Sequence, residues 1–217
     1  MLLPALSKAR QKARDISCIN NKKTIGVGFA LYHDDYSGFY PYNAANANEA
    51  GGNHGTSTAF DVAGNIVKSL WLEINGGTYS AMQRWAVNEC PSLISQPINS
   101  AYKLLNGQLL NGLVLYNTTS SSIMIDSIKS PSSKVVMMCN IVEDGKQTES
   151  IYFRPFYSDN SGTISGTTSH TLARSGVHRG GGAMGFLYAD GHANDEKQTF
   201  WMNGGTLNQT PFNPNAN

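Results

Sequence analysis

The chain has 217 residues, a formal net charge of +1, and charged side chains at only 14% of its positions. That length suits one domain, or one domain with a long helix. A chain of this size can bury a stable core without disulfides or metal ions. The near-zero charge gives no general reason to expect nucleic acid or acidic partners. A surface so poor in charge is typical of an exported protein, of one that packs against its own copies, or of a loop-rich fold.

Residues 1–40 predict one long amphipathic helix. Its stripe, apolar except at two positions, recurs at steps of three or four residues: Leu2, Leu6, Ala9, Ala13, Ile16, Asn20, Thr24, Val27 and Leu31. Gly38 and Pro41 are expected to end the helix. We expect Val27 and Leu31 to be buried against the rest of the protein.

The helix is also basic, with positive charges at Lys8, Arg10, Lys12, Arg14, Lys22 and Lys23. No aromatic residues that would stack bases accompany these cations, so we predict a solvated face and no nucleic-acid partner. Asp34 and Asp35 lie at the end of the helix, where carboxylates oppose the helix dipole. We expect water or a lysine side chain to offset this unfavourable interaction, and a bound Ca²⁺ is the alternative.

Beyond this helix the chain predicts a loop, a second helix and then short strands. Residues 42–60 lack any period, whereas apolar positions within 61–77 recur at helical spacing. The expected strands are residues 85–90, 109–116, 122–126, 134–142, 150–157 and 182–189. Asp-Gly pairs at 144–145 and 190–191 predict tight turns, the first joining strands 134–142 and 150–157. The Asn- and Pro-rich tail after Thr206 is expected on the surface.

This order of elements predicts the fold class α+β, with a long N-terminal α-helix packed on an antiparallel β-sheet. We expect two units, a helix over residues 1–40 and a globular α+β head over residues 41–217. Met184, Phe186 and Tyr188 alternate along the last expected strand and therefore share one face.

The three cysteines cannot all pair with one another. Cys18, on the helix, is expected to be a small buried apolar residue. Cys90 and Cys139 either form a disulfide in an oxidising compartment or remain free buried thiols. The sequence spacing leaves both states open.

Several motifs, taken in order, carry a family resemblance. They are residues 1–10, 18–26 and 32–41, then 89–92 (Glu-Cys-Pro-Ser), 131–136 (Pro-Ser-Ser-Lys-Val-Val), 178–182 and 186–192. This series resembles the type IV pilin-like or type II secretion pseudopilin family, in the branch with a prepilin-type N-terminal cleavage and methylation segment and a C-terminal His…Asp-Gly motif. There are two departures. Two extra residues separate His178 from Asp190, and Cys139 with Asn140 stands where the family has an acidic residue.

The resemblance implies a pilin-like fold and a structural subunit of a pilus-like or pseudopilus assembly. The subunit would pack with copies of itself or with other pilin-like subunits through Leu2, Leu3, Leu6, Ala9, Ala13 and Ile16. It would be exported and anchored in the inner membrane, with a periplasmic or extracellular head. In the family the anchor precedes the residues matched here, so the chain is expected to be N-terminally truncated, with Leu2, Leu3 and Leu6 exposed in an isolated monomer.

His178, Asp190 and His192 are the candidates for a structural metal ion, with His170 as a further one. Two imidazoles and a carboxylate suit a transition metal, but their spacing fits no standard zinc motif. The favoured interpretation has no cofactor. In it Asp190 and Gly191 form a two-residue hairpin turn, and the histidines hydrogen-bond to loop carbonyls.

The sequence contains no nucleophile elbow, no His-Glu-x-x-His motif and no paired carboxylates placed for acid–base catalysis, so we predict that the protein is not an enzyme. Two alternatives to a structural subunit stay open. One is a metal-dependent hydrolase that depends on His178 and Asp190. The other is a carbohydrate-binding surface module that stacks sugars on Trp71, Trp85 or Trp201.

Overall fold

The computed structural model describes residues 2–40, 87, 90–93, 108–111, 114, 123–139, 142–143, 146–147, 152–153, 177–179, 181–203, 206–207, 210–213 and 215. Its helices are α1 (Leu2–Asp35), α4 (Gln198–Trp201) and the 3-10 turns η4 (Ile125–Ser127) and η5 (Pro131–Ser133). Its strands are β1 (Gln108–Asn111), β2 (Val135–Cys139), β3 (Val142–Glu143), β4 (Lys146–Gln147), β5 (Tyr152–Phe153), β6 (Ala183–Tyr188), β7 (Ala193–Lys197), β8 (Met202–Asn203) and β9 (Thr206–Leu207). The predicted helix within 61–77, the loop at 42–60 and most of the strand at 85–90 lie outside the described residues.

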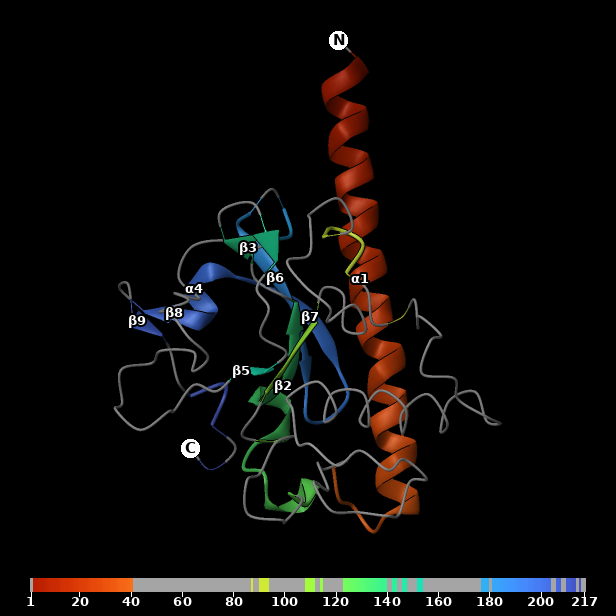
Figure 1. The fold of residues 1–217 in the computed structure, drawn as a ribbon, viewed down its shortest axis with the longest axis vertical. Helices are drawn as coiled ribbons and strands as arrows, with labels where there is room; N and C mark the ends of the chain where they lie inside the picture. The colour runs from red at the N-terminus through yellow and green to blue at the C-terminus, as the bar shows by residue number, and fades with distance from the viewer. Residues whose placement is uncertain are drawn as a thin grey trace.

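Helix α1 runs along one side of the sheet, and its first turns extend beyond the strands (Figure 1). The helix ends at Asp35, and Gly38 follows with a positive φ of 81°. This conformation lets the Gly38 N–H donate to the carbonyl of His33 at 2.7 Å, so the predicted stop at Gly38 is confirmed. None of the helices in the described part of the chain combines the length and the apolar character that a membrane span needs.

Five strands form the main sheet, in the order β5-β1-β2-β6-β7. The pairs β1–β2, β2–β6 and β6–β7 are antiparallel, and only the two-residue β5 at the edge runs parallel to its neighbour. Helix α1 contacts β6 and β7. The predicted α+β class, with a long helix on an antiparallel sheet, is confirmed.

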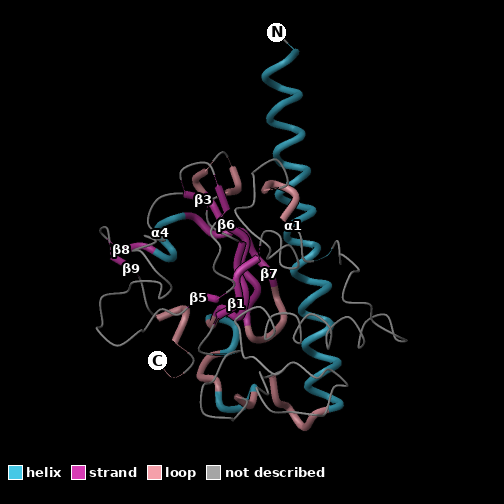
Figure 2. Tube along the Cα trace, viewed as in Figure 1, coloured by secondary structure: helices cyan, strands magenta, loops and turns pink. Residues whose placement is uncertain are grey.

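Strands β2 and β6 are buried along their whole length because both faces of the sheet are covered. On the face toward α1, Phe29 belongs to the same cluster as Leu187. On the other face, Phe186 packs with Trp201 and Phe212 at ring-centroid separations of 5.6 and 6.2 Å. Figure 2 shows the strands lying between α1 and the segment that carries α4, β8 and β9. A strand buried on both faces has a nearly continuous apolar sequence, which is why both strands could be predicted.

The turn at Asp190 and Gly191 is confirmed, but as a three-residue loop. The N–H of Tyr188 donates to the carbonyl of His192 at 2.9 Å, and the N–H of Gly191 donates to the carbonyl of Tyr188 at 3.0 Å. Gly191 has a positive φ of 86°. A turn followed by a left-handed residue is a common way to close a three-residue hairpin loop.

Two predictions about the strands need correction, and one strand was not predicted. Residues 144–145 join β3 to the short strand β4, whereas β5 pairs with β1 instead of completing that hairpin. Within the predicted strand at 122–126, Met124 forms a single bridge to Phe39, and η4 begins at the next residue, Ile125. The sequence does not predict β7, because four of its five residues are polar.

The tail prediction is wrong at Pro211 and Phe212, which are buried. The carbonyl of Pro211 accepts the N–H of Val135 at 2.7 Å, and the carbonyl of Phe212 accepts the side-chain amide of Asn111 at 2.8 Å. These two hydrogen bonds tie the C-terminal segment to the start of β2 and to the end of β1.

The apolar stripe of α1 faces away from the sheet. Leu6, Ile16, Val27 and Leu31 are 57%, 53%, 56% and 42% exposed, so the predicted burial of Val27 and Leu31 is wrong. The buried face consists of Asp15, Cys18, Lys22, Ile25, Gly26, Gly28 and Phe29. Lys22 is 0% exposed, which also corrects its assignment to a solvated face. At about 100° per residue, Val27 lies about 200° around the helix from Ile25.

Candidate functional site

Four metal-ligating side chains, three cysteines and one histidine, meet in the core between α1 and the sheet. Cys18 comes from the middle of α1, Cys90 from the start of the turn at 90–93, Cys139 from the end of β2, and His178 from the segment before β6. All four are at most 1% exposed. Their ligand atoms lie within 4.8 Å of one another.

The closest sulfur pair is Cys18 Sγ and Cys139 Sγ, which are 3.4 Å apart. His178 Nε2 lies 3.6 Å from the Sγ of Cys90 and 3.6 Å from the Sγ of Cys139. A disulfide brings its sulfurs to about 2.05 Å, so these sulfurs are in contact but not bonded. The three cysteines are free, and Cys90 and Cys139 do not form the disulfide considered from the sequence.

The orientation of His178 is fixed on its far side by a carboxylate. His178 Nδ1 lies 2.8 Å from Oδ1 of Asp195, a residue of β7. The proton therefore sits on Nδ1, and the Nε2 atom faces the sulfurs. Gly185 of β6 makes room for this ring, because a Cβ there would lie 3.0 Å from both Cε1 of His178 and Cε of Lys22.

The charges around the cluster favour a thiolate at Cys139. Burial raises the pKa of this thiol, but hydrogen bonds from Cys18 and Cys90 and the positive charges of Lys22 and His178 lower it well below its usual value. The hydrogen bond to Cys139 is also the largest cause that raises the pKa of Cys90. Burial lowers the pKa of His178, but the hydrogen bond to Asp195 and the Cys139 sulfur outweigh burial and raise it. The site thus favours the form of a cysteine that binds metals.

A second set of hydrogen bonds holds the segments that carry the ligands. Asp15 of α1 is 7% exposed and lies one turn before Cys18. Its Oδ1 accepts the hydroxyl of Ser92 at 2.9 Å and the amide of Gln11 at 2.8 Å. Its Oδ2 accepts the backbone N–H of Arg179 at 3.0 Å. One helical carboxylate therefore fixes both the turn after Cys90 and the residue after His178.

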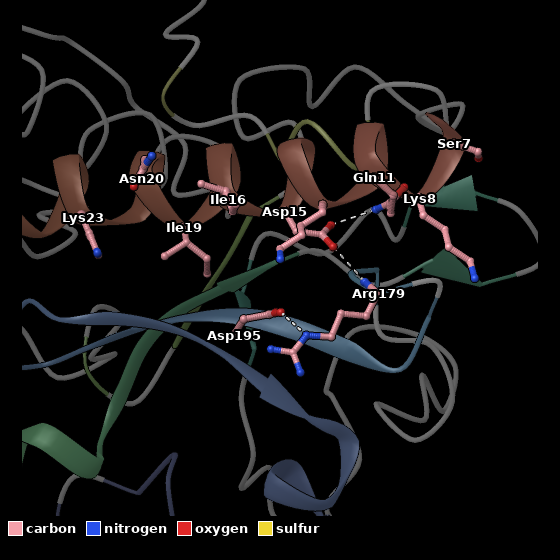
Figure 3. A pocket seen from close by; sticks show the side chains of 11 residues that line it. Ser7, Lys8, Gln11, Asp15, Ile16, Ile19, Asn20, Lys23, Arg179 and Asp195 are labelled. Atoms are coloured by element: carbon pink, nitrogen blue, oxygen red, sulfur yellow. Dashed lines mark hydrogen bonds and ion pairs between the residues drawn. The ribbon is translucent and has the colours of Figure 1, made fainter. Parts of the chain in front are cut away.

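A groove of about 990 Å³ runs beside this network along α1. Figure 3 shows Gln11, Asp15, Arg179 and Asp195 lining it, with the Arg179 side chain reaching Asp195. The Nε of Arg179 donates to Asp195 Oδ2 at 2.9 Å. Asp195 therefore connects the buried histidine on one side with a groove-lining arginine on the other.

The structure separates the metal candidates proposed from the sequence. His178 joins the cysteines, whereas Asp190 and His192 pair at the surface with Oδ1 and Nδ1 2.6 Å apart. Among the described residues, the cysteine–histidine cluster is the only group of three or more His, Cys, Asp or Glu side chains placed to share a metal. Asp34 and Asp35 are exposed at the end of α1.

The structure describes only some of the remaining candidates, which are His170, the three tryptophans and the assembly residues. His170, Trp71 and Trp85 lie outside the described residues. Trp201 is 0% exposed and so cannot stack a sugar at the surface. Of the proposed assembly residues, Leu6, Ala9, Ala13 and Ile16 are exposed, and the side chains of Leu2 and Leu3 lie outside the described part of the structure.

Sequence reasoning missed that the cysteines converge on His178. No Cys-x-x-Cys or other local spacing marks the cluster, because each ligand comes from a different segment. One signal was present, however. The motif segments at 18–26, 89–92 and 178–182 each contribute one ligand, and the strand that starts at Val135 ends in another, Cys139.

Comparison with known proteins finds a family whose sequence model matches part of the chain. The sequence model of the DUF1559 family (SBP_bac_10), described as proteins of unknown function, matches residues 7–106. The matched segment covers most of α1, with Cys18, and the turn that carries Cys90, and it ends before β1. The N-terminal part of the chain is therefore similar to this family. No curated protein matches the chain, and no solved structure does.

Proposed function

We propose that this chain is a structural subunit of a pilus-like or secretion pseudopilus assembly, and that it catalyses no reaction. The observation that carries this proposal is the apolar stripe on the outer side of α1. A monomeric protein normally turns the most apolar stripe of a long helix toward its own core. Here that stripe stays exposed at Leu6, Ile16, Val27 and Leu31.

The exposed stripe supports packing against the helices of other subunits. Its large apolar residues are separated by Ala9 and Ala13, which are exposed as well. Small residues between larger ones allow helices to approach closely and to interlock. The buried face holds the helix on its own head, so the opposite face is free to bind copies of the chain or other pilin-like subunits.

The resemblance of the motifs to pilin-like proteins supports the same proposal over the whole chain. The match to DUF1559 is compatible with a pilin-like surface protein. We further propose that the protein is exported and held at the inner membrane by an apolar segment before α1, with its head in the periplasm or outside the cell. Fractionation of cells that express the full-length gene tests this location.

The test of assembly uses Leu6→Asp and Ile16→Asp together in the full-length gene. A charge placed in an apolar interface costs several kcal/mol, and 1.4 kcal/mol already lowers an association constant tenfold. We expect the double variant to fold normally, since both side chains are exposed, and to lose filaments in sheared surface fractions. Ser7→Asp is the control for each single charge, because Ser7 is exposed and lies about 100° around the helix from Leu6 and about 180° from Ile16, away from the stripe. Normal filament yield from the folded double variant would refute the proposal.

A further inference from the structure

We propose that Cys18, Cys90, Cys139 and His178 bind one structural Zn²⁺ ion that fastens helix α1 to the head. This inference stands apart from the proposed function, because it concerns the interior of a single chain. It rests on the positions of the four ligand atoms, on their chemical type, on the residues behind them and on their burial.

The separations between the ligand atoms fit a tetrahedral zinc site. With Zn–S bonds of about 2.3 Å and a Zn–N bond of about 2.0 Å, a regular tetrahedron places sulfurs about 3.8 Å apart and sulfur about 3.5 Å from nitrogen. The Sγ atoms of Cys18 and Cys139 are 3.4 Å apart. His178 Nε2 is 3.6 Å from two of the sulfurs. Small movements of the side chains would bring the four atoms onto one ion.

The chemical type of the ligands selects the metal. Three thiolates and an imidazole suit Zn²⁺, whereas Ca²⁺ and Mg²⁺ prefer oxygen ligands. The bond between His178 Nδ1 and Asp195 at 2.8 Å supplies the carboxylate that usually supports a zinc-bound histidine. It leaves Nε2 as the ligand atom, and this atom lies on the side of the sulfurs.

The surrounding charges suit a zinc–thiolate centre. Three thiolates and one Zn²⁺ carry a net charge of −1, and a buried anion needs a nearby cation. Lys22 is 0% exposed, and its charge acts directly on Cys139. Cysteine and histidine bind metals only in their deprotonated forms, so the affinity of such a site for zinc falls with decreasing pH.

The site is built for structure and not for catalysis. A catalytic zinc keeps one position open for water or substrate, but here four protein ligands complete the tetrahedron. At most 1% of any of the four residues is exposed. The ligands come from α1, the turn at 90–93, β2 and the segment before β6. A single ion would therefore cross-link segments that are far apart in the sequence.

The test begins with the metal content of the 217-residue chain, purified without chelators in a reducing buffer. We expect about one zinc ion per chain, because four protein ligands complete one site. Cys90→Ser and Cys139→Ser should each lower the zinc content several-fold. His192→Ala is the matched control, since it removes an exposed histidine that lies outside the cluster, and it should retain the ion.

A chelator then tests the link to folding. EDTA should lower the melting temperature of the wild type and of His192→Ala, because loss of a ligand that binds only the folded state lowers stability. The melting temperature of Cys139→Ser should not respond. A Co²⁺-loaded wild type should show the strong absorption of tetrahedral cobalt with sulfur ligands. This measurement does not depend on the folding of any variant.

Three results would overturn the proposal. The first is a folded wild type without zinc whose three thiols all react after denaturation. The second is a Cys18–Cys139 disulfide, found by mass spectrometry of protein purified without reductant. The third is zinc content unaffected in both cysteine variants, which would place the ion elsewhere. None of these results bears on assembly, so the two proposals can fail separately.

Discussion

Gly26→Ala is expected to destabilise this protein, although alanine is the better helix former. Gly26 lies on the buried face of α1, and a Cβ there would sit 2.6 Å from the carbonyl oxygen of Gly191 and 3.1 Å from Cδ1 of Leu187. Close carbon–oxygen contacts usually measure about 3.3–3.6 Å, so the helix and the β6–β7 turn would have to separate by roughly 0.7–1 Å. Overpacking of this kind costs about 1–3 kcal/mol, and alanine regains about 1 kcal/mol of helix propensity.

The net effect should be a loss of about 1 kcal/mol, which in a chain of this size lowers the melting temperature by about 2–4 °C. Urea denaturation followed by circular dichroism gives the free energy of unfolding, and an unchanged m-value would show that the end states are preserved. Ala30→Gly is the control, because it measures the difference in helix propensity between alanine and glycine at an exposed position of the same helix. It should lower the free energy of unfolding by about 1 kcal/mol. If Gly26→Ala raised the stability instead, α1 would not pack as closely on the turn as the structure has it.

Three further changes test other parts of the molecule. Gly191→Val should cost about 1–3 kcal/mol, because a β-branched residue resists the φ of 86°, and a urea midpoint equal to that of the wild type would contradict the turn geometry. Burial lowers the pKa of His33 from 6.5 to about 4, so the unfolded state takes up its proton first and stability should fall as the pH drops through that range. His33→Phe should flatten this part of the pH profile of the melting temperature, and an identical profile would exclude His33 as the cause. Asp195→Asn should weaken Zn²⁺ binding about 10–100-fold in a chelator competition, and unchanged affinity would show that Asp195 does not orient His178.

The sequence predicts the parts of the fold whose pattern is local. Strands β2 and β6 are apolar without interruption, and α1 has a long helical period with a glycine at its end. Strand β7 could not be predicted in this way. Its residues Ala193–Lys197 are mostly polar, and their conformation is set by pairing with β6 along the whole strand. The same holds for Phe212, whose burial depends on Phe186 and Trp201 on the same face of the sheet.

The candidate site depends even more than the fold on contacts between distant segments, which the sequence does not show. His178 could be named from its motif, but its partners could not, because a metal site of four single ligands leaves no spacing to recognise. A cysteine in a helix is normally a small core residue, and that was the expectation for Cys18. Only the packing of α1 on the sheet brings Cys18 to within 3.4 Å of Cys139.

The error over Val27 and Leu31 has a physical cause that connects the two proposals. Periodicity identifies the most apolar stripe of a helix, and the core normally takes that stripe. The face of α1 that is buried contains Asp15, Cys18 and Lys22, which are favourable in a core only when partners from distant segments satisfy them. Ser92 and the backbone of Arg179 satisfy Asp15, and the cysteine–histidine cluster surrounds Cys18. These polar contacts, the packing of Ile25 and Phe29 in the core, and the proposed zinc would together hold this face on the head, so the fold does not use the apolar stripe. It remains available on the opposite side of the helix, where a subunit of an assembly would need it.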